Sequence, residues 1–185
     1  MNETVKTIKS RRSIRAYREE QIKKEELQAI LEAGIYAPSA VNQQSWHFTV
    51  IQNTQLLAEL SEQTKQLFLA SEHARYQKMA RNENFQLFYN APTLIIVSGD
   101  EQAIAPQADC AAATQNILLA AESLGIGSCW INMVMSLLHS EEGEPWIDKL
   151  GIPTGYRPLY SIALGYKQKD THTIPARKMD CINYL

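Results

Sequence analysis

Residues 91–131 have the sequence APTLIIVSGDEQAIAPQADCAAATQNILLAAESLGIGSCWI. The first part is a continuous apolar run that follows Pro92, which is typical of a buried strand. Residues 107–124 are rich in alanine and leucine and carry apolar side chains on nearly every helical face, which predicts a buried helix. Gly125 ends this helix, and the segment that begins there predicts a second strand. A helix this apolar does not suit the surface of a small domain, so we expect a homodimer interface to cover it.

The flanking sequence predicts further strands and helices on both sides of this stretch. Residues 46–51, WHFTVI, alternate Trp46, Phe48 and Val50 as in a half-buried strand, and residues 158–166, PLYSIALGY, also alternate. Helical patterns occupy residues 3–10, 23–37, 54–69, part of 71–90 and 136–150, and the tail 174–185 is expected to be a loop. About four strands separated by helical segments predict an α/β or α+β sheet covered by helices.

The length of 185 residues suits one domain with one core, and no repeat or linker divides the chain. Cys110, Cys129 and Cys181 lie far apart, and the four histidines form no HExxH motif, so neither a disulfide framework nor a metal site is expected. The N-terminus has no signal-peptide pattern, and no apolar run approaches the ~20 residues that span a bilayer. We therefore expect a cytoplasmic protein that does not enter membranes.

The net charge of −2 conceals a basic N-terminal segment. Residues 1–24 carry eight basic and three acidic side chains, a net charge of +5, which leaves −7 for the rest of the chain. This asymmetry predicts an anionic partner for the segment, either nucleic acid or a small phosphate compound.

Residues 10–17, SRRSIRAY, contain the groups that a phosphate needs. The guanidinium groups of Arg11, Arg12 and Arg15 offer rigid donor pairs, and the Ser13 hydroxyl adds a neutral donor. The alternative interpretation is a solvated basic face. Near the other end of the chain, Arg177 and Lys178 either join these arginines or are surface charges.

Two further segments carry polar groups or glycines beside predicted strands. In residues 36–48, YAPSAVNQQSWHF, amides and hydroxyls could hydrogen-bond the edge of a heteroaromatic ring, or they form an ordinary helix-to-strand loop. In residues 124–132, LGIGSCWIN, the glycines would let a flat ligand approach the backbone, or they form a tight turn. Cys129 lies in an apolar strand with no adjacent base, which indicates inert packing rather than a nucleophile.

Several nucleotide and hydrolase motifs are missing from the sequence. It contains neither a GxxxxGK[ST] loop nor a GxSxG elbow. Its GxG at residues 125–127 follows a helix rather than a strand, which disfavours a dinucleotide-binding Rossmann unit.

Taken together and in this order, the segments RRSIRAY, APSAVNQQSWHF, LGIGSCWI and the terminal LGY followed by a proline and basic residues resemble the nitroreductase family of FMN-dependent oxidoreductases. The resemblance spans nearly the whole chain. It implies an α+β fold with a central, mostly antiparallel β-sheet flanked by helices. It also implies a single FMN-binding domain over residues 1–185 and a homodimer with FMN near the subunit interface.

The resemblance also assigns cofactor-binding positions. Arg177 and Lys178 match basic residues that complete the phosphate site, and Pro38 to Asn42 match a segment that in the family usually reaches the flavin of the other subunit. Ala40 stands where serine is common, and residues 99–107 leave little room for a substrate-covering helix. The full set is Arg11, Arg12, Ser13, Arg15, Pro38, Ser39, Ala40, Asn42, Asn84, Gly127, Ser128, Cys129, Arg177 and Lys178.

The activity implied by the resemblance is that of an FMN-dependent NAD(P)H oxidoreductase. NADH or NADPH would pass a hydride to flavin N5, and a small-molecule oxidant, such as a nitro compound or a quinone, would then take the electrons in a ping-pong cycle. The sequence identifies no protein residue as a catalytic acid or base. The alternatives are a flavin-binding or flavin-storing protein without turnover, a family member that carries out reductive dehalogenation or other flavin chemistry, and a nucleic-acid binder with a basic arm. The acidic total charge and the absence of a recognised nucleic-acid-binding module disfavour a nucleic-acid partner.

Overall fold

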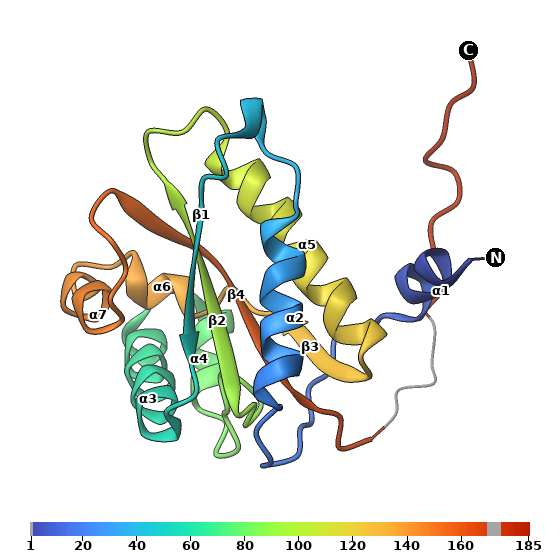
Figure 1. Cartoon of the computed structure of the whole chain (residues 1–185). Coiled ribbons are helices and arrows are strands. Elements are labelled where there is room, and N and C mark those ends of the chain that lie inside the picture. The colour runs from blue at the N-terminus through green and yellow to red at the C-terminus, as the bar shows by residue number, and fades with distance from the viewer. Residues whose placement is uncertain (1, 170–174) are drawn as a thin grey trace.

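The computed structural model describes residues 2–169 and 175–185. Within these residues, four strands form one antiparallel sheet in the order β1-β2-β4-β3 (Figure 1). The strands are β1 (Trp46–Ile51), β2 (Thr93–Asp100), β3 (Ile126–Trp130) and β4 (Tyr156–Tyr166). The helices are α1 (Glu3–Ser10), α2 (Lys24–Ile35), the 3-10 turn η1 (Ala40–Asn42), α3 (Thr54–Ala70), α4 (Ala74–Ala80), α5 (Pro106–Ser123), α6 (Met135–Leu138) and α7 (Glu144–Lys149).

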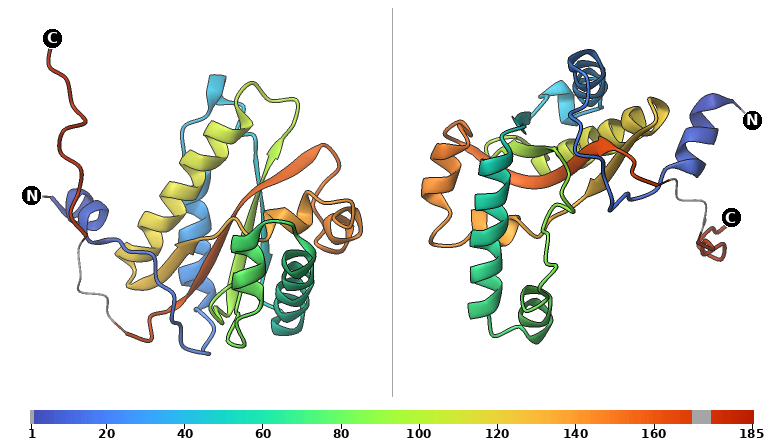
Figure 2. Two further views of the ribbon diagram at one scale, coloured as in Figure 1. Left: turned by 180° about the vertical axis from the view of Figure 1, so that it is seen from behind. Right: turned by 90° about the horizontal axis from the view of Figure 1, so that it is seen from below.

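Helices cover both faces of the sheet and give the molecule three layers (Figure 1, Figure 2). The central strand β2 sends Leu94 and Ile96 into the core beneath α3 and α6, and Ile95 and Val97 into the core beneath α2 and α5. This explains why β2 is apolar at almost every position rather than at alternate ones. The α+β class with an antiparallel sheet flanked by helices is confirmed.

Helix α5 packs against both the sheet and α2, and seven of its 18 residues are buried within the single chain. Gly34 of α2 packs directly against Ile117 of α5, and the Asn116 side chain donates a hydrogen bond of 3.0 Å to the Ala33 carbonyl oxygen. Burial within one chain therefore accounts for part of the apolar composition of α5, whereas Ala111, Ala112, Leu119 and Ala120 remain partly exposed. The expected homodimer interface over residues 107–124 stays a prediction.

Two local expectations need correction. The helix expected over residues 136–150 is broken into α6 and α7, because the chain turns at Gly143 so tightly that a side chain there would collide with the Leu138 carbonyl oxygen. In β4, Tyr160 pairs with Val97 and Pro158 pairs with Ser98, so Leu159 is an extra residue in a bulge. The strict alternation expected from Leu159 onward therefore begins only after the bulge. Among the described residues, no helix has both the length and the apolar character that crossing a membrane requires.

Candidate functional site

The basic N-terminal motif forms an extra, strand-like segment beside the sheet. The Ile14 amide donates to the Ser128 carbonyl oxygen of β3 at 2.9 Å, and the Arg18 amide donates to the Tyr166 carbonyl oxygen of β4 at 2.9 Å. Ile14 and Tyr17 are buried and anchor the segment. We call Arg11, Arg12, Ser13 and Arg15 the arginine segment; the sheet edge holds its backbone in place.

The arginine segment lies next to Cys129, which brings together several of the predicted residues. Burial raises the pKa of the Cys129 thiol, and the Arg15 cation, the Ser13 hydroxyl and the Arg11 cation offset part of this rise. Ser13 also forms an isolated bridge with Ser128. The predicted positions Arg11, Ser13, Arg15, Ser128 and Cys129 therefore share one neighbourhood. The raised pKa agrees with an inert thiol at Cys129.

Arg12 is the buried cation of this neighbourhood. Its side chain is only 9% exposed, and its Nη1 donates to the carbonyl oxygens of Lys9 at 2.7 Å and Arg11 at 2.6 Å. Among the described residues, its Nε and Nη2 meet no acceptor. Burying a cation with unmet N–H groups is costly unless an anion completes the site. The arginine segment therefore fits a phosphate group.

A cavity of about 700 Å³ opens beside the arginine segment. Typical small-molecule sites span roughly 300–1,000 Å³. Arg15 and Asn84 both line the cavity, and the Arg15 guanidinium carbon lies 5.8 Å from the centre of the Tyr89 ring. Tyr89 and Asn90 have φ values of 56° and 57°, a left-handed conformation that non-glycine residues rarely adopt. Such local strain is common at ligand sites, where the fold holds side chains in place.

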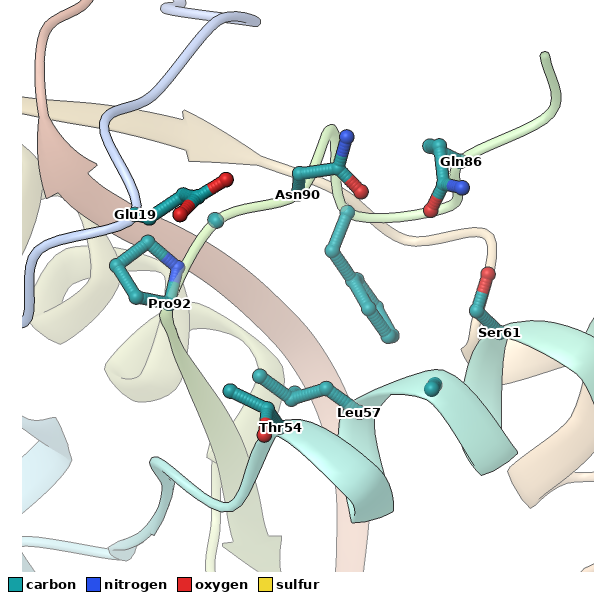
Figure 3. A pocket seen from close by; sticks show the side chains of 10 residues that line it. Glu19, Thr54, Leu57, Ser61, Gln86, Asn90 and Pro92 are labelled. Carbon is teal, nitrogen blue, oxygen red and sulfur yellow. The ribbon is translucent and has the colours of Figure 1, made fainter.

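A second cavity of about 440 Å³ adjoins the first and shares Glu19, Gln86 and Asn90 with it (Figure 3). The floor in this view is α3, which carries Leu57 and Ser61, and the Ser61 side chain points upward from it. Its lining contains the carboxylate of Glu19 but neither lysine nor arginine. An anionic group is therefore better accommodated by the larger cavity beside Arg15.

The polar loop that follows α2 lies away from the arginine segment in the folded chain. We call residues 38–45 the tip loop; it includes Pro38, Ser39, Ala40 and Asn42. Figure 1 shows η1 at one end of α2 and the chain that leads from the arginine segment at the other end. Because α2 has 12 residues, these ends are about 18 Å apart. One protomer thus does not bring the tip loop to its own arginine segment.

The tip loop is strained and exposed. Val41, Asn42 and Gln44 have φ values of 44°, 58° and 50°, and the left-handed region is particularly unfavourable for a β-branched valine. The Val41 side chain is 79% exposed, although it is apolar. Both features indicate that this loop contacts another molecule.

The other predicted residues have separate surroundings. A Cβ atom at Gly127 would lie 3.0 Å from Ile14 Cγ2, so packing of the arginine segment explains the glycine, and a contact with a ring stays a prediction. Arg177 and Lys178 lie on the exposed tail. Within the described residues, their polar contacts are with Pro175, Asp180 and Cys181 of the same tail, so the structure does not bring them to the arginine segment.

Sequence reasoning missed three residues that the structure places at these sites. Tyr89 and Asn90 line the larger cavity, and Asp109 of α5 accepts hydrogen bonds from the tip loop. A single aspartate in the first turn of an otherwise apolar helix was the available signal for Asp109. The asparagine just before a strand was a weaker signal for Asn90.

Comparisons with known proteins agree with this geometry. The model of the family described as "Nitroreductase family" matches residues 8–166. A crystal structure of a nitroreductase with bound FMN from Bacteroides fragilis is 40% identical, covers 100% of both chains and has a TM-score of 0.92. A nitroreductase with bound FMN from Desulfitobacterium hafniense is 34% identical, with coverage of 100% and 99% and a TM-score of 0.91. An Archaeoglobus fulgidus protein named "Putative NADH dehydrogenase/NAD(P)H nitroreductase" is 35% identical over 92% of this chain and 88% of its own.

Proposed function

Because the chain belongs to the nitroreductase family, we propose that it is an FMN-dependent NAD(P)H oxidoreductase that reduces nitro compounds or quinones. The observation that carries the proposal is the buried Arg12 guanidinium, whose Nε and Nη2 meet no acceptor among the described residues. The FMN bound in two solved relatives supports the same proposal, because FMN carries the phosphate that such a site needs. Residues 1–185 would form a single FMN-binding domain.

The arginine segment would hold the phosphate. Arg12 supplies two buried nitrogen donors, Nε and Nη2, while Arg11 and the Ser13 hydroxyl provide further donors from the same neighbourhood. Hydrogen bonds between guanidinium and phosphate are strong because both partners are charged. The sheet-bonded backbone of residues 11–18 keeps these donors in place before the ligand arrives.

The larger cavity would hold the ring. Arg15 places a cation at its wall, Asn84 offers an amide, and Tyr89 offers an aromatic surface. FMN, when bound, supplies the hydride chemistry between NADH or NADPH and the oxidant. The Arg15 cation would stabilise the negative charge that reduction places on the ring. This chain then needs no acid–base pair of its own.

We further propose a homodimer that brings the tip loop of one protomer to the flavin of the other. One protomer keeps its tip loop about 18 Å from the chain that leads to its own arginine segment, as the length of α2 requires. Exposed apolar side chains gather around the tip loop, namely Ile35, Tyr36, Val41 and Ile104. A partner subunit would cover this surface and complete the site.

The visible absorption of the purified protein tests the cofactor assignment. We expect a yellow protein, or one that turns yellow when reconstituted, with one FMN per chain. Release of the cofactor and its separation from FAD and riboflavin identifies it. Stoichiometric FAD with no affinity for FMN would contradict the proposal, and so would a colourless protein that binds no flavin.

A further inference from the structure

Asp109 connects the interior of the chain to the tip loop. This residue is only 3% exposed and lies in the first turn of α5. One oxygen accepts a hydrogen bond of 2.9 Å from the Ala40 amide, and the other accepts one of 2.8 Å from the Ser45 hydroxyl. One buried carboxylate therefore holds both ends of the strained part of the loop.

The residues between these two bonds are the ones with unfavourable backbone. Val41, Asn42 and Gln44 are left-handed, and their side chains are exposed. Further bonds support the loop, from the Gln44 amide to Ser39 Oγ at 2.9 Å and from the Ile104 amide to Gln43 Oε1 at 2.8 Å. Of these contacts, the bonds to Asp109 are the ones that tie the loop to a buried charge.

A carboxylate is the side chain that suits this position. Two donors converge on it, and each carboxylate oxygen can accept one. Asparagine has nearly the same shape, but its NH₂ group would face one of the donors. The first turn of a helix also favours a negative charge because the helix dipole is positive there.

We propose that Asp109 is a positioning residue for the flavin site of the opposite protomer. It fixes the tip loop in its strained conformation before the flavin binds, so that loop groups meet the partner's flavin without further ordering. The inference rests on the proposed FMN function and on the proposed dimer. A buried carboxylate in α5 of one subunit thereby controls flavin affinity in the other.

The first test is the FMN affinity of Asp109→Asn. Losing one bond to a charged acceptor should weaken FMN binding by about tenfold. Ser45→Ala removes one donor and keeps the bond from Ala40, so its effect should have the same sign and be smaller. Asn116→Ala is the matched control, because it removes another, partly buried hydrogen bond of α5, to Ala33 of α2, without touching the loop. It should lower the unfolding temperature with FMN affinity unchanged within about twofold.

The second test separates positioning from general destabilisation by using tagged heterodimers. Asp109→Asn is combined with Arg12→Ala, which disables the phosphate donors. In the same-chain placement one protomer carries both changes and its partner carries neither. In the opposite placement one protomer carries Asp109→Asn and the other carries Arg12→Ala. If Asp109 serves the partner's flavin, opposite placement leaves one intact site and same-chain placement leaves none. FMN titration should then show one parental-affinity site per dimer with opposite placement only.

The outcomes distinguish this inference from the proposed function. A wild-type protein that binds no FMN would contradict both. A wild-type protein that binds FMN, together with parental affinity in Asp109→Asn, overturns the inference alone. An intact site that appears only when both changes share one chain overturns it as well, because Asp109 would then act on its own subunit's flavin.

Discussion

Arg12 shows how a single buried side chain can indicate a ligand. Its guanidinium is anchored through Nη1 to two backbone carbonyl oxygens, which fixes its orientation. Among the described residues, Nε and Nη2 meet no acceptor although they are shielded from water. An anion with several acceptor oxygens would satisfy both groups at once.

We expect Arg12→Ala to weaken FMN binding by roughly one to two decades, as the loss of a charge-assisted hydrogen bond implies. Riboflavin lacks the phosphate, so its affinity should be low in the parent and change little in the variant. Fluorescence titration of both flavins measures this difference. Lys9→Ala is the charge-matched control, because Lys9 is an exposed cation at the end of α1, just before the arginine segment, and it should leave both affinities within about twofold. Equal losses for FMN and riboflavin would remove Arg12 from the phosphate site.

The cysteines allow an independent check on the residue environments. Burial raises the pKa of Cys110 to about 12 and also raises the pKa of Cys129, whereas Cys181 lies on the exposed tail. Only the thiolate reacts with common thiol reagents. At pH 8 the native protein should therefore show one fast thiol per chain, and the denatured protein should show three. Fast labelling of Cys129 in the native protein would contradict its buried position beside Ser13.

Individual residues differ in how well the sequence could predict them. The arginine segment was predictable because three arginines and a serine within five residues suit phosphate chemistry whatever the fold. Asp109 was not, because its partners Ala40 and Ser45 are more than 60 residues away in the chain. The strain at Tyr89 and Asn90 was also hidden, since neither residue is a glycine.

At the scale of elements, the strands and α5 followed from composition and periodicity. Strand β2 and helix α5 were predictable because burial on all sides demands apolar residues at nearly every position. The sequence did not show that α2 covers α5, because this contact joins segments about 80 residues apart. It also did not show the break between α6 and α7, which depends on a backbone contact at Gly143.

Gly165 of β4 packs against Tyr17, which anchors the arginine segment. A Cβ atom there would lie 2.7 Å from Pro92 Cδ and 3.1 Å from Tyr17 Cδ1, so alanine must displace one of these rings. We expect Gly165→Ala to lower the free energy of unfolding by about 1–3 kcal/mol, as overpacked cores do. Urea denaturation of the apo protein measures this loss.

Flavin binding should respond as well, because Tyr17 anchors the arginine segment through its hydroxyl bond of 2.7 Å to the Ile14 carbonyl oxygen. Gly151→Ala serves as the control. Gly151 has open space around it and a φ of 64°. Alanine there should lower the free energy of unfolding by about 1 kcal/mol through backbone strain, without any change in FMN affinity. A Gly165→Ala variant as stable as the parent would show that Gly165 does not pack tightly against Pro92 and Tyr17.

At the scale of the whole molecule, the proposed flavin site requires two copies of the chain. Ile104 is 71% exposed and lies beside the tip loop, where its amide donates to Gln43. A charge there should cost little in a monomer but should disrupt an interface. We expect Ile104→Glu to shift a micromolar dimer toward monomer in sedimentation experiments and to weaken FMN binding.

Gln66→Glu adds the same charge to an exposed position on α3, on the other side of the sheet, and should leave the dimer intact. A parent protein that stays monomeric while it binds FMN tightly would refute the shared site. A dimer unaffected by Ile104→Glu would place the interface elsewhere.

Anaerobic titration of the FMN-loaded protein tests the central claim, that this chain is a flavin-dependent oxidoreductase. One equivalent of NADH or NADPH per FMN should bleach the visible flavin band, because hydride transfer reduces the ring by two electrons. A nitro compound or a quinone, added next without oxygen, should restore the band. A band that persists through excess NADH and NADPH would contradict the account and would favour a protein that binds flavin without turnover.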